Sequence, residues 1–177
     1  MTLSTNTFGL RKEWLIAVGN QVKDKLITRN ILMEIGLGNR QADALMIWLR
    51  ALGYVIRVNG KLIISSSFFR LLEIDPTLVD SSSWHKILLK LIEPSCGLLF
   101  IRWYLLHSAT FVEKPKEVLL REFESYVYPK VFSTRTLNNA FSSLRDFMLR
   151  TPTGEELGFF KYRCSLISRD PDRKSVV

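Results

Sequence analysis

The feature that most constrains the fold of this 177-residue chain is an Asn-Gly pair, Asn59-Gly60, between two short β-branched runs. The runs cover residues 54–58, Tyr-Val-Ile-Arg-Val, and residues 61–65, Lys-Leu-Ile-Ile-Ser. Asn-Gly is a strong hairpin signal, because both central residues of a type I′ turn need positive φ. The pattern therefore predicts an antiparallel β-hairpin.

Two helical patterns lie well upstream of this hairpin. Apolar side chains recur at helical spacing from Leu10 to about Lys25, which predicts a first helix. Thr28 is a good N-cap for a second, short helix that ends at Ile35.

A third helix is predicted over residues 40–52, with Asn39 as its N-cap and Gly53 as the residue that ends it. At about 100° per residue, the apolar face of this helix consists of Ala42, Leu45, Met46, Leu49 and Leu52. The opposite face, which is expected to be exposed, consists of Arg40, Asp43, Ala44, Ile47 and Ala51.

Three helices followed by a hairpin form the order of elements in a winged helix. The glycine-rich turn at residues 36–38 is typical of the joint in a helix-turn-helix. In that architecture the third helix enters the major groove of DNA, and the hairpin, or wing, reaches the neighbouring backbone. We therefore expect a mainly α protein, with an N-terminal winged helix (three helices plus a β-hairpin wing) followed by a helical bundle.

Helical patterns also fill the second half of the chain, and prolines separate them. These helices are expected near residues 83–93, 96–109, 114–127 and 134–149. Asp75-Pro76 and the polar stretch 80–83 mark a boundary between the two halves. The prediction is a winged-helix domain over residues 1–75 and a helical domain over residues 76–177.

The distribution of charge favours an anionic partner. Lysine and arginine number 25 against 17 aspartates and glutamates, which gives a formal net charge of +8. Residues 1–72 hold ten basic and four acidic side chains, whereas residues 73–177 hold 15 and 13. A basic field concentrated on one module favours a polyanion, and DNA is the first candidate.

Eight residues are the candidates for contact with DNA: Arg29, Asn39, Arg40, Gln41, Ala44, Ile47, Arg57 and Lys61. Five of them belong to the start and the exposed face of the third helix. There an arginine such as Arg40 can pair with guanine, a glutamine such as Gln41 can pair with adenine, and Ile47 can touch a thymine methyl group.

The other three candidates are expected to contact phosphates. Arg57 and Lys61 flank the tip of the predicted wing, and Arg29 lies near the N-terminus of the second helix. An alternative stays open: the helix face is solvated on a winged helix that binds protein, and the two wing charges protect strand edges.

No catalytic or metal motif is evident in the sequence. P-loop, Gly-x-Ser-x-Gly and His-Glu-x-x-His patterns are absent, and His85, Cys96 and His107 lack the spacing of a zinc site. The carboxylates occur in three pairs, Glu113/Glu117, Glu122/Glu124 and Glu155/Glu156. Salt-bridged helix faces explain these pairs better than a metal site does. Catalytic residues stay unknown, and a divalent cation such as Mg²⁺ is expected only if the protein nicks DNA.

The sequence predicts a cytoplasmic protein without a membrane partner. No apolar run approaches the roughly 20 residues of a membrane helix, and the first residues lack the apolar core of a secretory signal. Two cysteines cannot form a disulfide framework.

Short blocks between residues 8 and 106 follow the order found in one bacterial family. They are Phe8-Gly9-Leu10-Arg11-Lys12-Glu13-Trp14, Glu34-Ile35-Gly36-Leu37-Gly38-Asn39, Ile47-Trp48, Ala51-Leu52-Gly53-Tyr54-Val55-Ile56, Ile74-Asp75-Pro76-Thr77-Leu78-Val79-Asp80 and Trp84. In this order the blocks resemble domains of unknown function that are associated with DNA phosphorothioation systems, among them an SspB-like nicking component.

The resemblance implies a role in a phosphorothioation-based DNA modification and antiviral defence system. It implies DNA and other proteins of that system as partners, with strand nicking or recruitment of sulfur-transfer machinery as the activity. Trp84 is followed by His85-Lys86 rather than by the family's His-Trp pair, and no family catalytic residue can be carried onto this chain. The alternative is a non-catalytic winged-helix regulator or assembly subunit that binds a promoter or a partner protein.

Overall fold

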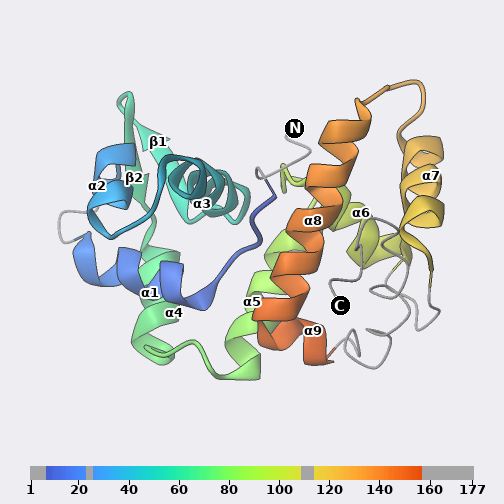
Figure 1. Ribbon diagram of the computed structural model, residues 1–177. Helices are drawn as coiled ribbons and strands as arrows, with labels where there is room; N and C mark the ends of the chain where they lie inside the picture. Colours follow the sequence, from blue (N-terminus) through green and yellow to red (C-terminus); the bar gives the residue numbers. More distant parts are fainter. Residues whose placement is uncertain (1–6, 23–25, 109–113, 157–177) are drawn as a thin grey trace, which may run out of the picture.

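The computed structural model describes residues 7–22, 26–108 and 114–156, and this part is mainly helical with one two-stranded antiparallel hairpin. The elements form two groups that lie side by side (Figure 1). The first group contains α1 (Lys12–Gln21), α2 (Arg29–Glu34), α3 (Asn39–Ala51), β1 (Val55–Val58), β2 (Lys61–Ile64) and α4 (Ser66–Ile74). The second contains α5 (Ser81–Ile92), α6 (Leu99–Trp103), the π-helical turn η1 (Tyr104–Ser108), α7 (Lys116–Val127), α8 (Thr134–Arg150) and α9 (Pro152–Glu156).

The three helices expected before the hairpin are confirmed, with one correction to their caps. Thr28 is the N-cap of α2, and its hydroxyl accepts the N–H of Ile31 at 3.3 Å. The prediction that Asn39 caps α3 was wrong by one residue, because Asn39 is already helical and Gly38 is the N-cap. The side-chain oxygen of Gln41 accepts the Gly38 N–H at 3.1 Å, which satisfies a donor at the helix start.

The hairpin is confirmed, and a short segment at residues 26–27 pairs with its second strand. Asn59 and Gly60 have φ of 50° and 80°, the left-handed values that the turn requires. Leu26, between α1 and α2, forms an antiparallel bridge with Ile63 of β2, and the N–H of Ile27 donates to the carbonyl of Leu62 at 3.0 Å. The sequence pattern did not predict this segment, because two residues are too few to show a strand period.

The helices of the second group follow the predicted ranges except at residues 96–109. There α6 begins only at Leu99 and passes into the π-helical turn η1. Ser133 caps α8 by accepting the N–H of Thr136 at 3.2 Å.

Asp75 organises the loop between α4 and α5. Its buried carboxylate accepts the N–H groups of Asp80 at 2.9 Å and Val79 at 3.3 Å. The indole N–H of Trp84 donates to the carbonyl of Leu78 at 3.0 Å. Burial raises the pKa of Asp75, but the hydrogen bonds from Asp80 and its neighbours outweigh burial, so the net pKa is lowered. Hydrogen bonds therefore fix the chain where the domain boundary is predicted.

The two groups of elements share one hydrophobic core. Trp48 of α3 is fully buried, and its ring centroid lies 5.2 Å from that of Phe147 in α8. The Phe147 ring in turn lies 6.4 Å from that of Trp84 in α5. The division at residue 75 stays a prediction, and side chains from both sides of it are buried together.

The segment that leads into α1 passes between α3 and α8 and hydrogen-bonds to both (Figure 1). The carbonyl of Phe8 accepts the indole N–H of Trp48 and the hydroxyl of Ser143, each at 3.0 Å. The N–H of Gly9 donates to the carboxylate of Asp146 at 2.9 Å. A Cβ at Gly9 would lie 2.1 Å from the backbone nitrogen of Phe147, so only glycine fits this position.

Replacing Gly9 by alanine should therefore separate the segment from α8. We expect Gly9→Ala to lower the free energy of unfolding by about 1–3 kcal/mol or more, since the backbone of α8 cannot move aside as a side chain can. Denaturant unfolding measures this loss. Gly97→Ala is the matched control, because a Cβ there meets no atom within 4 Å. Equal stability of the two variants would contradict the close approach.

Candidate nucleic-acid interface

Helix α3 is covered on two sides, which narrows the face that can meet a ligand. Its buried residues are Ala42, Ala44, Leu45, Trp48 and Leu49. The buried arc is rotated by about 60° from the predicted apolar face, away from Met46 and toward Trp48. The cause is the second group of elements, because α8 packs on the Trp48 side of α3.

This rotation removes one predicted contact residue. Ala44 is fully buried, so the prediction that it faces DNA was wrong. Ala44 lies one helical turn before Trp48, on the side of α3 that the second group covers. Nothing in the local sequence shows this, because the covering residues lie about 100 positions further along the chain, beyond any local periodicity.

The N-terminal turn of α3 stays accessible. Asn39 and Arg40 are exposed, whereas Gln41 is half-buried and its oxygen is used for the Gly38 N–H. The NH₂ group of Gln41 and one lone pair of its oxygen remain for a base, and the bond to Gly38 restricts how the amide can turn. Ile47 is half-buried and packs partly against the core.

Arg29 and Asp43 join α2 to α3 in a two-point ion pair. Arg29 Nε lies 2.9 Å from Asp43 Oδ1, and the terminal nitrogen NH2 donates to Oδ2 at 3.1 Å. Both side chains are about half exposed, at 52% and 45%. Asp43 therefore neutralises the cation that was expected to reach a phosphate.

Arg50, which sequence reasoning did not include, is exposed in the last turn of α3. It lies seven residues after Asp43 and three after Ile47, so the three share a helix face. Helical spacing of three residues, counted onward from Ile47, would have identified Arg50 from the sequence.

Arg57 and Lys61 are both exposed beside the hairpin turn, on opposite faces of it. In the observed register Arg57 is opposite Leu62 and Val58 is opposite Lys61. Cross-strand partners point to the same face and successive residues alternate. Arg57 and Lys61 can therefore meet two different surfaces, or the two sides of a groove edge.

The Lys61 face of the hairpin is apolar. Ile56 and Val58 are 46% and 40% exposed, and Leu26, bridged to Ile63 on the same face, is 37% exposed. Exposed aliphatic side chains gathered on one sheet face are typical of a protein contact rather than a phosphate contact.

The candidate metal-binding and nucleophilic residues do not converge in the described part of the chain. No group of three or more His, Cys, Asp or Glu there is placed to hold a metal ion. Cys96 is buried, and burial raises the pKa of its thiol. Glu122 accepts hydrogen bonds from Lys114 at 2.8 and 2.9 Å, which lower its pKa. Glu113, by contrast, lies outside the described residues.

Comparisons of the chain with protein-family models, with curated proteins and with solved structures find no match. Within the described ranges, no helix combines the length and the apolar character that a membrane crossing needs.

Proposed function

We propose that the protein binds double-stranded DNA as a winged helix, with α3 in the major groove and the β1–β2 hairpin against the neighbouring backbone. The main support for the proposal is the position of the exposed residues. The accessible start of α3 and a hairpin tip with two exposed cations belong to the same small module. The bridge from Leu26 to Ile63 supports the winged-helix assignment, because it ties the hairpin to the segment between α1 and α2.

The side chains on this module suit separate parts of DNA. Arg40, at the exposed N-terminal turn, has the planar fork that pairs with guanine. Arg50, Arg57 and Lys61 supply positive charge for phosphates, which give affinity without sequence information. Asn39 lies beside Arg40 and can donate to a phosphate or a base.

The resemblance to the phosphorothioation-associated family extends the proposal to strand nicking, with Mg²⁺ as the cation that nicking would need. We expect binding to be separable from cutting in an assay on supercoiled plasmid with and without Mg²⁺. Relaxed circles that form only with the cation would support nicking. Binding without relaxed circles would limit the function to DNA recognition.

A second candidate function is that of a regulator or assembly subunit that binds a partner protein. The apolar hairpin face of Leu26, Ile56, Val58 and Ile63 favours it. Val58→Ser separates the two functions, because it makes this face polar without adding a charge opposite Lys61, its cross-strand partner. Unchanged duplex affinity in Val58→Ser, with a loss in Arg40→Ala, would place the face outside the DNA contact and favour its use by a partner protein.

Arg40→Ala tests the proposed DNA contact directly. If Arg40 pairs with a base, its loss should weaken duplex binding by about 1–3 kcal/mol in fluorescence anisotropy at fixed salt. Arg135→Ala is the control, since Arg135 is an exposed arginine in the first turn of α8, outside the proposed interface. The same loss in both variants would mean that Arg40 contributes only overall charge.

Asp43→Asn should strengthen binding. The substitution removes the carboxylate that holds Arg29, so the guanidinium gains access to a phosphate and the module gains one positive charge. The slope of log affinity against log salt should steepen by about 0.9 for one additional phosphate contact. Titrations at several salt concentrations measure the slope. An unchanged slope and affinity would exclude Arg29 from the interface.

A further inference from the structure

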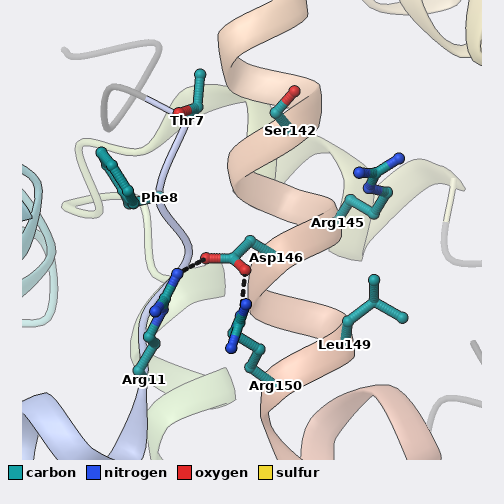
Figure 2. Close-up of a pocket in the computed structure, with 8 residues that line it drawn as sticks. All are labelled: Thr7, Phe8, Arg11, Ser142, Arg145, Asp146, Leu149 and Arg150. Atoms are coloured by element: carbon teal, nitrogen blue, oxygen red, sulfur yellow. Dashed lines mark hydrogen bonds and ion pairs between the residues drawn. The ribbon is translucent and has the colours of Figure 1, made fainter.

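An open surface pocket of about 680 Å³, called the cavity below, lies where the segment before α1 meets α8, away from the proposed DNA interface. Its polar wall is formed by Thr7, Arg11, Ser142, Arg145, Asp146 and Arg150 (Figure 2). Two of its guanidinium groups, those of Arg11 and Arg150, contact the carboxylate of Asp146, whereas Arg145 points away from it (Figure 2). The volume falls within the range of small-molecule sites, which is roughly 300–1,000 Å³.

Asp146 positions two of the three arginines. Its Oδ2 accepts from the Arg11 terminal nitrogen NH2 at 3.2 Å, and its Oδ1 accepts from Arg150 Nε. Oδ2 also accepts the N–H of Gly9 at 2.9 Å. The described wall of the cavity therefore holds three arginines and one aspartate, which gives it a formal net charge of +2.

Donors remain available after these contacts are made. Arg145 is exposed, and no side-chain hydrogen bond or ion pair joins it to another described residue. Its N–H donors are therefore available to a ligand that enters the cavity. The hydroxyls of Ser142 and Thr7 add two neutral donors on the same wall.

Thr7 is at the rim in a strained conformation. Its φ of 77° lies in the left-handed region, which a β-branched residue rarely adopts. Such strain is concentrated at ligand-binding positions, where surrounding contacts hold it in place.

We propose that this cavity binds a phosphate monoester. The net charge of +2 on the wall matches a dianionic phosphate, and guanidinium groups fit phosphate oxygens in two-point hydrogen bonds. Arg145 and Arg150 contact the phosphate, and Asp146 is a positioning residue that orients Arg11 and Arg150. This site does not depend on the proposed DNA binding by α3.

The phosphate monoester has two sources, a free nucleotide or the phosphorylated end of a DNA strand. The first test uses inorganic phosphate alone, with NMR titration of the backbone amides. We expect saturable shifts at Ser142 and Arg145, which line the cavity, and about tenfold weaker binding in Arg145→Gln. Arg135→Gln is the matched control, because it removes an exposed arginine from the same helix outside the cavity.

Absence of saturable binding, or equal weakening in Arg145→Gln and Arg135→Gln, would overturn the site. Arg145→Lys gives a second measure, since it keeps the positive charge and loses the planar guanidinium. If Arg145→Lys binds phosphate more weakly than the wild type and more tightly than Arg145→Gln, two-point recognition by the guanidinium is supported. A loss of fold in any variant is detected by its thermal transition, and Arg145 makes no contact in the described structure that the fold depends on.

Two further arms identify the source and separate this proposal from DNA binding by α3. Adenosine monophosphate that binds tighter than inorganic phosphate, with the same dependence on Arg145, supports a nucleotide ligand. A 5′-phosphorylated strand that binds tighter than its unphosphorylated form supports a strand end. Arg40→Ala should leave phosphate binding unchanged, so a failure of α3 as the DNA reader leaves the result for the cavity intact.

Discussion

The docking of residues 8–11 between α3 and α8 is the contact on which the rest of the structure depends. One backbone carbonyl, that of Phe8, accepts from Trp48 of α3 and from Ser143 of α8. Gly9 allows this approach because it has no Cβ, and its N–H fixes Asp146. The two groups of elements thereby share a core, and the indole N–H of Trp48 and the amide N–H of Gly9 each have an acceptor.

This docking determines which face of α3 is accessible to the proposed DNA ligand. The docked segment contacts Trp48, and Ala44 is buried one turn before it, so one side of α3 is withdrawn from solvent and Arg40, Asp43, Ile47 and Arg50 lie on its accessible face. In the proposed complex with DNA, this narrow face of mixed charge would contact the groove with few residues. The hairpin cations would then supply much of the affinity, since phosphate contacts dominate it.

Local sequence patterns predict much of the fold. The predictions that were wrong concern residues whose neighbours in the structure lie far away in the sequence. The Asn59-Gly60 turn, the Thr28 cap and the helical spacing are local signals, and the structure agrees with them. The burial of Ala44 and the role of Gly9 depend on α8, more than 90 residues away in each case, so no local period contains them. Of the candidate site, the exposed position of Arg40 followed from helix geometry, whereas the pairing of Arg29 with Asp43 needed the angle between two helices.

The two basic sites share one electrostatic arrangement. In each, an aspartate binds arginines that would otherwise be free: Asp43 holds Arg29, and Asp146 holds Arg11 and Arg150. The carboxylate lowers net positive charge and fixes the orientation of a flexible side chain, so the site loses long-range attraction and gains geometric selectivity. Asp43 is about half exposed, so solvent and salt screen its pair strongly, whereas Asp146 is only 19% exposed and its pairs are screened less. We therefore expect the proposed DNA contact at α3 to depend on salt, and the arginines of the proposed phosphate site beside α8 to keep their orientation.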